Sequence, residues 1–554
     1  MIRLVALART NTSIINKLNL LCYFVSTTLV LTVSLQQHLQ ESSALSTTNR
    51  ATKIQTRPSS FLTTMSASAS SSSSPTSSSP APPTVSFTDN PKPRLTIPEP
   101  ICSDVPGSWA YDTMSRRVDE EILQRTLEDN IDVLGTSSDP KYRQVVTKFQ
   151  SLRDELRTSS PIKMLEELDL SHPDYTDEEK ALRRREYDEW SLMLQALLEN
   201  NDTWLTAPWL VAEFYVYRRL IEATGFWDRS SPLYKFDPFQ KQKNAGLVSS
   251  VGSAEPMLGK VLQLDKLTAD ASTAAPAAAA GGGSTNLLEN GVNIAASIAL
   301  WGNKMDLSLW PADAANADVD IFSSILEIAH ENLLHDDSNS LAEHCIKLHN
   351  NGGGNVDIIV DNAGFELITD LALAQYLVDS GIAKCVTFQL KSHPTFVSDA
   401  LEKDLLEHIE HYASLDVSTY PNAKASGQKW KQFIQDGRWK ANEDNFWCQP
   451  FAMWDMTEPL RSDLRDRCDL AFVKGDANYR RLLGDCMWDM TAPFEDVVGS
   501  YFPCPVCALR TLKAEIGCGM DADQIERAKS LDDNWQVNGR FGVVHFGRGA
   551  PKSE

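Results

Sequence analysis

The sequence predicts an α/β protein in which an all-helical N-terminal domain precedes a domain built on a doubly wound parallel sheet. Residues 109–227 carry apolar residues at helical spacing between charged ones, which indicates amphipathic helices. From Asn355 onward, short apolar runs alternate with helical patterns, as expected when helices connect parallel strands. These two patterns together predict the fold class.

The spacing of apolar residues also predicts the individual elements. We expect helices at 119–134, 142–157, 176–199, 209–223, 292–301 and 321–334. Strands are expected at 356–360, 384–390, 469–473 and 507–512, where β-branched and other apolar residues form compact runs. A further amphipathic helix is predicted at 400–412.

Composition sets the expected domain limits. Residues 1–100 are rich in Ser, Thr and Pro and are predicted to be a low-complexity or targeting segment that is largely disordered. We expect the helical domain at 101–240, a low-complexity insertion at 241–290 and the α/β domain at 291–554. The insertion is predicted to be a linker or loop because residues 273–283 form an Ala and Gly tract without charge.

The first residues allow two interpretations. Arg3, Arg9 and Lys17 precede a mainly apolar stretch at 18–35, which favours a signal or transit peptide. The alternative is an inert extension, with Met65 as the true start. The apolar stretch contains hydroxyl residues and is shorter than the ~20 residues of a spanning helix, so we expect no stable membrane association.

Charge and cysteine content limit the partners and the compartment. The chain has 52 Lys and Arg residues against 74 Asp and Glu, a net charge of −22, which would repel a nucleic-acid backbone. Its 10 cysteines are scattered over 554 residues and are typical of reduced thiols. We therefore expect a cytoplasmic protein that does not bind nucleic acid.

A carboxylate and an amide follow the strand at 356–360. Asp361 and Asn362 lie directly after this buried run and before a helical pattern, so they occupy the carboxyl end of a strand. Ligands bind at this edge of open α/β sheets. A polar pair in this position has no packing role, although Asn362 could also serve to shape the turn.

The next strand adds a second carboxylate, Asp399. If the sheet is parallel, Asp361, Asn362 and Asp399 gather at one edge and form an all-oxygen site suited to a hard or borderline divalent cation such as Mg²⁺ or Mn²⁺. The alternative for Asp399 is an N-cap, because Glu402 follows it at capping-box spacing.

Two cations follow the later strands. Arg480 and Lys513 could hold a phosphate at the same edge, and a metal beside a phosphate implies phosphoryl chemistry. In the alternative interpretation both side chains are solvated ends of elements, and Asp476 only caps the helix that carries Arg480.

Several stretches, in order along the chain, resemble one known family. They are TWLTAPWLVAEFYVYRR (203–219), DPF (237–239), LWGNKMDLSL (300–309), VDNAGFELITDLAL (360–373), KSHPTFVSD (391–399), FVKGDANYRRLLGD (472–485) and LRTLKAE (509–515). On these stretches the chain resembles the damage-control phosphatases, in the subgroup also called acidic-residue methyltransferase-like. The similarity extends roughly from residue 106 to the C-terminus.

The resemblance implies a helical domain before a Rossmann-like domain and a metal-dependent phosphomonoesterase. It implies that Asp361, Asn362 and Asp399 are catalytic and bind Mn²⁺, Ni²⁺, Co²⁺ or Mg²⁺. Substrate contacts are implied for Asp361, Asn362, Asp476, Asn478, Arg480 and Lys513. The implied substrates are small sugar phosphates and related damaged phosphometabolites, of which fructose 1-phosphate is typical.

Two questions of function stay open at this point. The nucleophile is either a water activated by the metal or the Asp361 carboxylate itself. The alternative activity is S-adenosylmethionine-dependent methylation of a protein carboxylate, which is proposed for members of the subgroup. We rank it below hydrolysis because the chain has no Gly-rich cofactor loop in the usual place.

Overall fold

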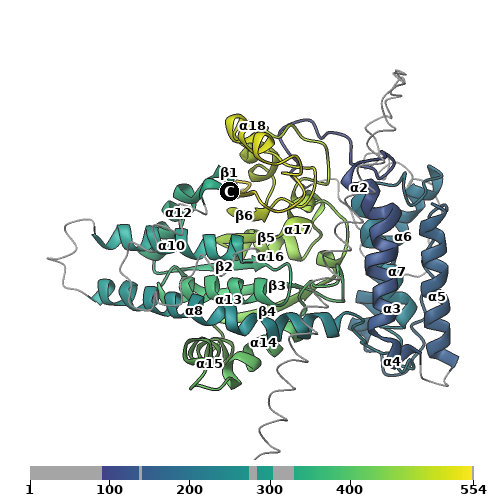
Figure 1. Ribbon diagram of the computed structural model, residues 1–554, viewed down its shortest axis with the longest axis horizontal. Helices are drawn as coiled ribbons and strands as arrows, with labels where there is room; N and C mark the ends of the chain where they lie inside the picture. Colours follow the sequence, from purple (N-terminus) through teal and green to yellow (C-terminus); the bar gives the residue numbers. More distant parts are fainter. Residues whose placement is uncertain (1–89, 136–139, 274–282, 303–329, 552–554) are drawn as a thin grey trace, which may run out of the picture. The chain divides into compact units, whose positions relative to one another are not determined.

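Figure 1 shows the computed structural model, which describes residues 90–135, 140–273, 283–302 and 330–551. The expectations for residues 1–89 lie outside this part of the chain. So do most of the Ala and Gly tract, most of the stretch at 300–309 and the start of the helix expected at 321–334.

The N-terminal part is helical, as predicted. Its elements are α2 (Trp109–Asp112), η2 (Thr113–Gln124), α3 (Arg125–Asp129), α4 (Ile131–Leu134), α5 (Pro140–Arg157), α6 (Asp177–Glu199) and α7 (Trp209–Thr224). The helix expected at 119–134 is divided among η2, α3 and α4. A capping box between Thr176 and Glu179 starts α6, and Gly225, with a φ of 69°, ends α7.

Two long helices occupy most of the expected insertion, so the prediction of a linker or loop at 241–290 is wrong for the described residues. They are α8 (Gln240–Thr273) and α10 (Gly283–Trp301). Leu247, Val251 and Leu258 of α8 are buried against the apolar residues of α10 and α13 (Phe365–Asp379). Small and polar residues such as Ser250 and Ala254 interrupt the apolar pattern of α8, although both side chains are buried.

A seven-stranded sheet forms the centre of the α/β part. Its strands are β1 (Leu333–Asp336), β2 (Gly354–Ile359), β3 (Ala383–Lys391), β4 (Trp439–Asp444), β5 (Leu470–Lys474), β6 (Val506–Thr511) and β7 (Gly542–Gly547), in the order β1-β7-β6-β5-β2-β3-β4. All neighbouring strands are parallel except β6 and β7. The four predicted strands and the α/β class are confirmed.

The sheet differs from the prediction at its edges. Strands β1, β4 and β7 were not predicted. The helix expected to reach residue 334 ends before β1. The edge strand β4 is rich in polar residues, and β1 has only four residues. Strands of this kind lack the apolar run by which we identified the central ones. The antiparallel pairing of β7 makes the sheet mixed rather than wholly parallel.

The order of the central strands creates a switch point beside β2. From β2 the chain passes through α13 to β3 and then to β4, whereas β5 pairs with the opposite side of β2. The carboxyl ends of β2 and β5 therefore lie next to each other while their connections leave in opposite directions. Ligand sites of open α/β sheets form at such a point.

Both faces of the sheet are covered. The remaining helices are α12 (Ser338–Asn350), α14 (Glu402–Ser414), α15 (Pro421–Gln435), α16 (Leu460–Arg467), α17 (Asp476–Leu482) and α18 (Ala522–Leu531). Ile358 and Phe472 face the core formed by α8, α10, α13 and α15. Ile359 and Val473 belong to a second core that continues into the helical region, including Phe214 of α7.

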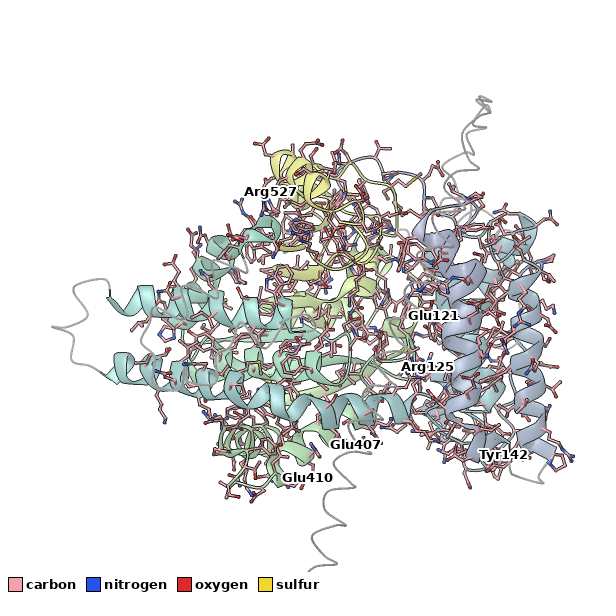
Figure 2. All side chains as sticks on the ribbon, in the orientation of Figure 1. Glu121, Arg125, Tyr142, Glu407, Glu410 and Arg527 are labelled. Atoms are coloured by element: carbon pink, nitrogen blue, oxygen red, sulfur yellow. The ribbon has the colours of Figure 1, made fainter. Side chains whose placement is uncertain are left out.

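The surface carries the expected charged side chains. Glu121, Glu407 and Glu410 are exposed (Figure 2). Within the described residues, no helix combines the length and the apolar character needed to cross a membrane.

A buried ion pair supports β2 and gives a stability prediction. Asp357 has no exposed side-chain surface, and Arg467 of α16 contacts its two carboxylate oxygens at 2.7 and 2.8 Å. Arg467→Ala should lower the free energy of unfolding by about 3 kcal/mol, because it leaves a buried carboxylate without its cation. Urea denaturation measures this loss.

Arg465→Ala is the matched control on the same helix. Arg465 contacts the exposed Asp466, so its removal should cost less than about 1 kcal/mol. Equal losses in the two variants would contradict the role assigned to Arg467.

Candidate functional site

A short backbone pairing brings the predicted site residues together. Residues 361–363, which follow β2, lie antiparallel to residues 398–400, with Asn362 opposite Asp399. The Ala363 N–H donates to the Ser398 carbonyl at 2.7 Å, and the Ala400 N–H donates to the Asp361 carbonyl at 2.9 Å. The structure therefore places Asp361, Asn362 and Asp399 side by side at the carboxyl edge of the sheet.

Asn362 orients the carboxylates around it. Its Nδ2 donates to Asp361 Oδ2 at 2.7 Å and to Glu366 Oε2 at 2.9 Å. Its Oδ1 accepts a hydrogen bond from the Ser398 hydroxyl. The amide thus has a definite role beyond shaping the turn, because it holds one carboxylate from the strand end and one from the first turn of α13.

Asp399 does not cap a helix. Helix α14 begins at Glu402, its N-cap is Leu401, and the Leu401 N–H donates to Asp404 at 3.0 Å. Asp399 lies before this cap and is 1% exposed, and its Oδ2 lies 2.5 Å from Lys391 Nζ. The alternative interpretation of Asp399 as an N-cap is therefore wrong.

Burial and neighbouring carboxylates disfavour negative charge at this site. Burial, followed by the charges of Asp399 and Glu366, raises the pKa of Asp361 well above its ordinary value, against the opposing effect of Lys391 and Lys513. Burial also raises the pKa of Asp399, whereas the charge of Lys391 lowers it. A divalent cation would offset both charges.

The donor set fits a hard or borderline cation. Two carboxylates and one amide supply only oxygen ligands, the type that Mg²⁺ and Mn²⁺ prefer. In the described part of the chain, no three His, Cys, Asp or Glu side chains form a metal-binding group. A site at Asp361, Asn362 and Asp399 does not conflict with this, because its third member is an asparagine.

The end of β5 comes very close to Asp361. A Cβ atom at Gly475 would lie 1.9 Å from Asp361 Oδ2, and Gly475 has a φ of 82°. Only glycine accommodates both this contact and this backbone conformation. Gly475 therefore allows the two central strands to converge on the carboxylate.

Asp476 connects β6 to the start of α17. The N-cap of α17 is Gly475, whereas the Asp476 carboxylate accepts hydrogen bonds from Arg510 Nε at 2.7 Å and from the Lys513 N–H at 3.2 Å. The interpretation of Asp476 as a cap is therefore wrong. Its contacts fix the backbone at Lys513.

Lys513 is the cation that remains available at the site. Its charge lowers the pKa of Asp361 and so favours the charged form of this carboxylate. Among the described residues, this half-buried ammonium has no ion-pair or hydrogen-bond partner. A cation that is near the cluster but unpaired suits a phosphate ligand.

Arg480 and Asn478 do not belong to the carboxylate cluster. Their side chains bind other residues of the protein and stabilise the position of α17. The Arg480 guanidinium binds Glu213 at 2.7 Å and Asp485 at 2.8 and 3.0 Å, and it stacks on Trp209 at 3.6 Å. Asn478 Nδ2 donates to the carbonyls that follow β2 and end β5, at 3.1 and 3.0 Å. The structure thus does not present the Arg480 side chain to a ligand at the carboxylate cluster.

Sequence analysis missed three members of the site. Glu366 and Gly475 were not considered, although both belong to the stretches that carry the family resemblance. Lys391 could have indicated a buried carboxylate nearby, because a lysine at the end of an apolar strand is either exposed or paired with a buried charge.

The chain also contains a cavity of about 350 Å³ in the helical region. Arg183, Glu222 and Trp227 contribute to its lining, and none of the predicted site residues does. Its position makes it a separate feature from the carboxylate cluster.

Comparisons with known proteins identify the family. A sequence model described as "Damage-control phosphatase ARMT1-like domain" matches residues 113–528. The chain belongs to this family. It is 30% identical over 468 residues to the protein named Damage-control phosphatase ARMT1 from Danio rerio, covering 81% of this chain and 97% of the relative.

The chain is also similar to other proteins. The proteins of the same name from Homo sapiens and Bos taurus are 29% and 31% identical, covering 81% and 79% of this chain and 98% and 96% of the relatives. A crystal structure of a DUF89 family protein from Pyrococcus horikoshii covers 67% of this chain and 90% of that chain, with 16% identity and a TM-score of 0.33. The family resemblance seen in the sequence is confirmed.

The contact between Gly475 and Asp361 gives a prediction with a matched control. Gly475→Ala and Gly437→Ala both place a side chain at positive φ, 82° and 77°, which costs about 1 kcal/mol. Only at Gly475 does the new Cβ collide with a carboxylate, whereas no atom lies within 4 Å at Gly437. We expect Gly475→Ala to lose about 2 kcal/mol more, which thermal unfolding followed by circular dichroism measures. Equal shifts in melting temperature would contradict it.

Proposed function

We propose that this protein is a metal-dependent phosphomonoester hydrolase acting on small phosphorylated metabolites at the carboxyl ends of β2, β3, β5 and β6. The pair of buried carboxylates, Asp361 and Asp399, carries this proposal, together with Lys513, which acts electrostatically on Asp361 and whose ammonium has no partner among the described residues. Such a group can bind a cation and a phosphate together. The family and the printed name of the relatives, damage-control phosphatase, support the same class of reaction.

The finer proposal concerns the metal and the substrate. Asp361, Asn362 and Asp399 would hold Mn²⁺, Ni²⁺, Co²⁺ or Mg²⁺, since all four accept oxygen ligands. Sugar phosphates of the fructose 1-phosphate type, and related damaged phosphometabolites, are the proposed substrates. The charge of the cluster favours small anions held through a bridging cation, because the carboxylates alone would repel them.

Each side chain has a defined task in this proposal. The bound cation would polarise the phosphoryl group and neutralise part of its charge. Lys513 would bind the phosphoryl oxygens and offset the charge that develops on them. Asp476 fixes the Lys513 backbone, and Asn362 holds the Asp361 carboxylate in one orientation.

Asp361 would also act on the phosphoryl group directly. As a carboxylate it can attack phosphorus directly or accept a proton from an attacking water, and both roles require its deprotonated form. Arg480 and Asn478 support the reaction indirectly in this arrangement, through the position of α17.

The metal requirement gives the first test of this function. Removing divalent ions with a chelator should abolish the release of phosphate from a panel of sugar phosphates, because the carboxylates would then repel the substrate. Mn²⁺, Co²⁺ or Ni²⁺ should restore it. Full turnover in excess chelator, with no metal found by elemental analysis, would contradict the proposal.

Lys513 gives the second test and separates hydrolysis from methyl transfer. Lys513→Ala should lower kcat/KM for a sugar phosphate by about 10²-fold, because a contact that strengthens in the transition state is lost. Methyl transfer from S-adenosylmethionine to a protein carboxylate, measured in the same preparation, should not change.

Lys529→Ala is the control for this substitution. Lys529 is an exposed lysine of α18 whose ammonium pairs with Glu526 at 2.8 Å, and it belongs to no part of the proposed site, so its loss should leave kcat/KM unchanged. A wild-type protein that methylates carboxylates and hydrolyses no phosphomonoester in the panel would reverse the ranking of the two activities.

A further inference from the structure

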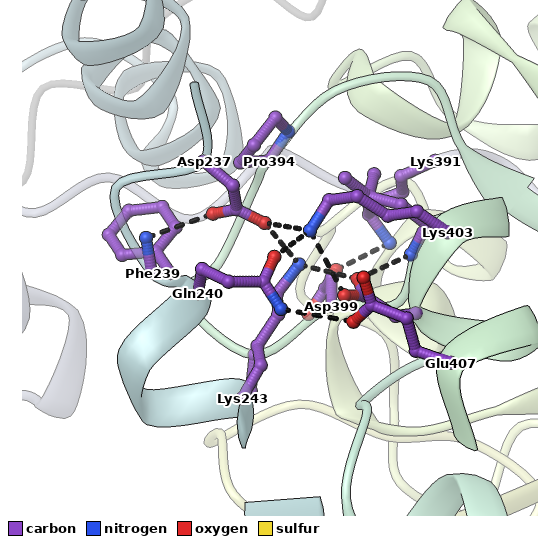
Figure 3. A network of polar contacts seen from close by, with 12 residues as sticks. Asp237, Phe239, Gln240, Lys243, Lys391, Pro394, Asp399, Lys403 and Glu407 are labelled. Carbon is purple, nitrogen blue, oxygen red and sulfur yellow. Dashed lines mark hydrogen bonds and ion pairs between the residues drawn. The ribbon is translucent and has the colours of Figure 1, made fainter. Parts of the chain in front are cut away.

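Lys391 is a buried cation that the proposed reaction does not use. It is the last residue of β3, its side chain is 2% exposed, and its Nζ lies 2.5 Å from Asp399 Oδ2 (Figure 3). Among the described residues, Asp399 is the one carboxylate within 4 Å of this ammonium. A buried lysine is costly unless a specific charge balances it, so its partner indicates its role.

The charges around Lys391 show what it balances. Asp361 and Asp399 are both buried, and Glu366 adds a third carboxylate close to them. Lys391 favours the charged form of both aspartates. Lys243 also favours the charged form of Asp399, and Lys513 that of Asp361, but Lys391 is the lysine that forms a direct ion pair with Asp399.

A divalent ion would supply the same compensation. An ion held by Asp361, Asn362 and Asp399 would stand close to the Lys391 ammonium and repel it, since both carry positive charge. The two cations are therefore competitors for the Asp399 carboxylate.

We propose that Lys391 is an internal counter-ion that exchanges with the divalent metal. It pairs with Asp399 in the metal-free protein and releases this carboxylate when the ion binds. This inference rests on the proposed function, because it requires a metal at Asp361, Asn362 and Asp399.

The local structure permits this exchange. The Lys391 N–H donates to the Ala400 carbonyl at 3.3 Å, which anchors the backbone at the end of β3. The ammonium stands on a flexible four-carbon chain and can leave Asp399 while the backbone stays in place. The backbone pairing between residues 361–363 and 398–400 is independent of the Lys391 side chain, so the ligands would keep their positions.

The exchange and a purely structural role predict opposite changes in metal affinity. If Lys391 only stabilises the ligand loop, its removal should lower both the stability and the affinity. If it competes with the metal, its removal should destabilise the metal-free protein and tighten metal binding.

Lys391→Met tests this, because methionine keeps an unbranched side chain of similar length and removes the charge. We expect a lower melting temperature for the metal-stripped variant and a Kd for Mn²⁺, measured by isothermal titration calorimetry at pH 8, at least about tenfold below that of the wild-type protein. An unchanged or weaker affinity in a folded variant would overturn the proposal.

Lys243→Met is the matched control. Lys243 is equally buried and pairs with Asp237 at 3.0 Å and Asp404 at 2.8 Å, neither of which is a proposed ligand (Figure 3). Its charge also lowers the pKa of Asp399, but less than that of Lys391 does, and Lys243 forms no ion pair with that carboxylate. It should lower the melting temperature but change the Kd for Mn²⁺ by less than about threefold. A tightening equal to that of Lys391→Met would show a general effect of positive charge and would overturn the exchange.

A measurement on the wild-type protein keeps the test decisive if Lys391→Met does not fold. In a crystal structure with Mn²⁺, Lys391 Nζ should lie more than 4 Å from both Asp399 oxygens, and retention of the ion pair beside the bound metal would overturn the proposal. If the wild-type protein binds no divalent ion at all, the metal-dependent function fails. If it binds Mn²⁺ but Lys391 keeps its contact, only the exchange fails.

Discussion

The antiparallel pairing of residues 361–363 with residues 398–400 is the constraint on which the site depends. Two backbone hydrogen bonds place Asp361 and Asp399 side by side in a buried environment, where their charges repel. Neighbouring residues offset the electrostatic repulsion between the two carboxylates. Lys391 balances Asp399, Asn362 holds Asp361, and Gly475 leaves room for the carboxylate.

The helical region contributes to the same arrangement from a distance in sequence. Lys243, at the start of α8, joins Asp237 to Asp404 in a buried ion-pair chain (Figure 3). Asp404 lies one helical turn before His408, whose Nε2 accepts a hydrogen bond from the Gly364 N–H at 2.8 Å. Burial lowers the pKa of His408 to about 4, so its imidazole stays neutral and able to accept this bond. The helical region therefore helps to fix the loop after β2.

The sequence was sufficient for elements whose pattern is local. Strands β2, β5 and β6 are compact apolar runs, and α6 has a capping box, so each was predicted near its observed limits. The role of Arg480 could not be predicted correctly, because its partner Glu213 lies 267 positions away. The sequence alone does not show that these two residues form an ion pair. Helix α8 was missed because its buried face includes Ser250 and Ala254 in place of a regular apolar stripe.

Pairing in three dimensions also decides which cations at the sheet edge can bind a ligand. Lys474 contacts Asp370 at 2.7 Å, Arg510 contacts Asp476 at 2.7 Å, and Arg480 contacts Glu213 and Asp485. Each of these cations is buried and already paired with a carboxylate, so binding a phosphate would require breaking that ion pair. Lys513 has no such partner among the described residues. Because its charge also acts on Asp361, Lys513 is the cation that we propose for the phosphate of the substrate.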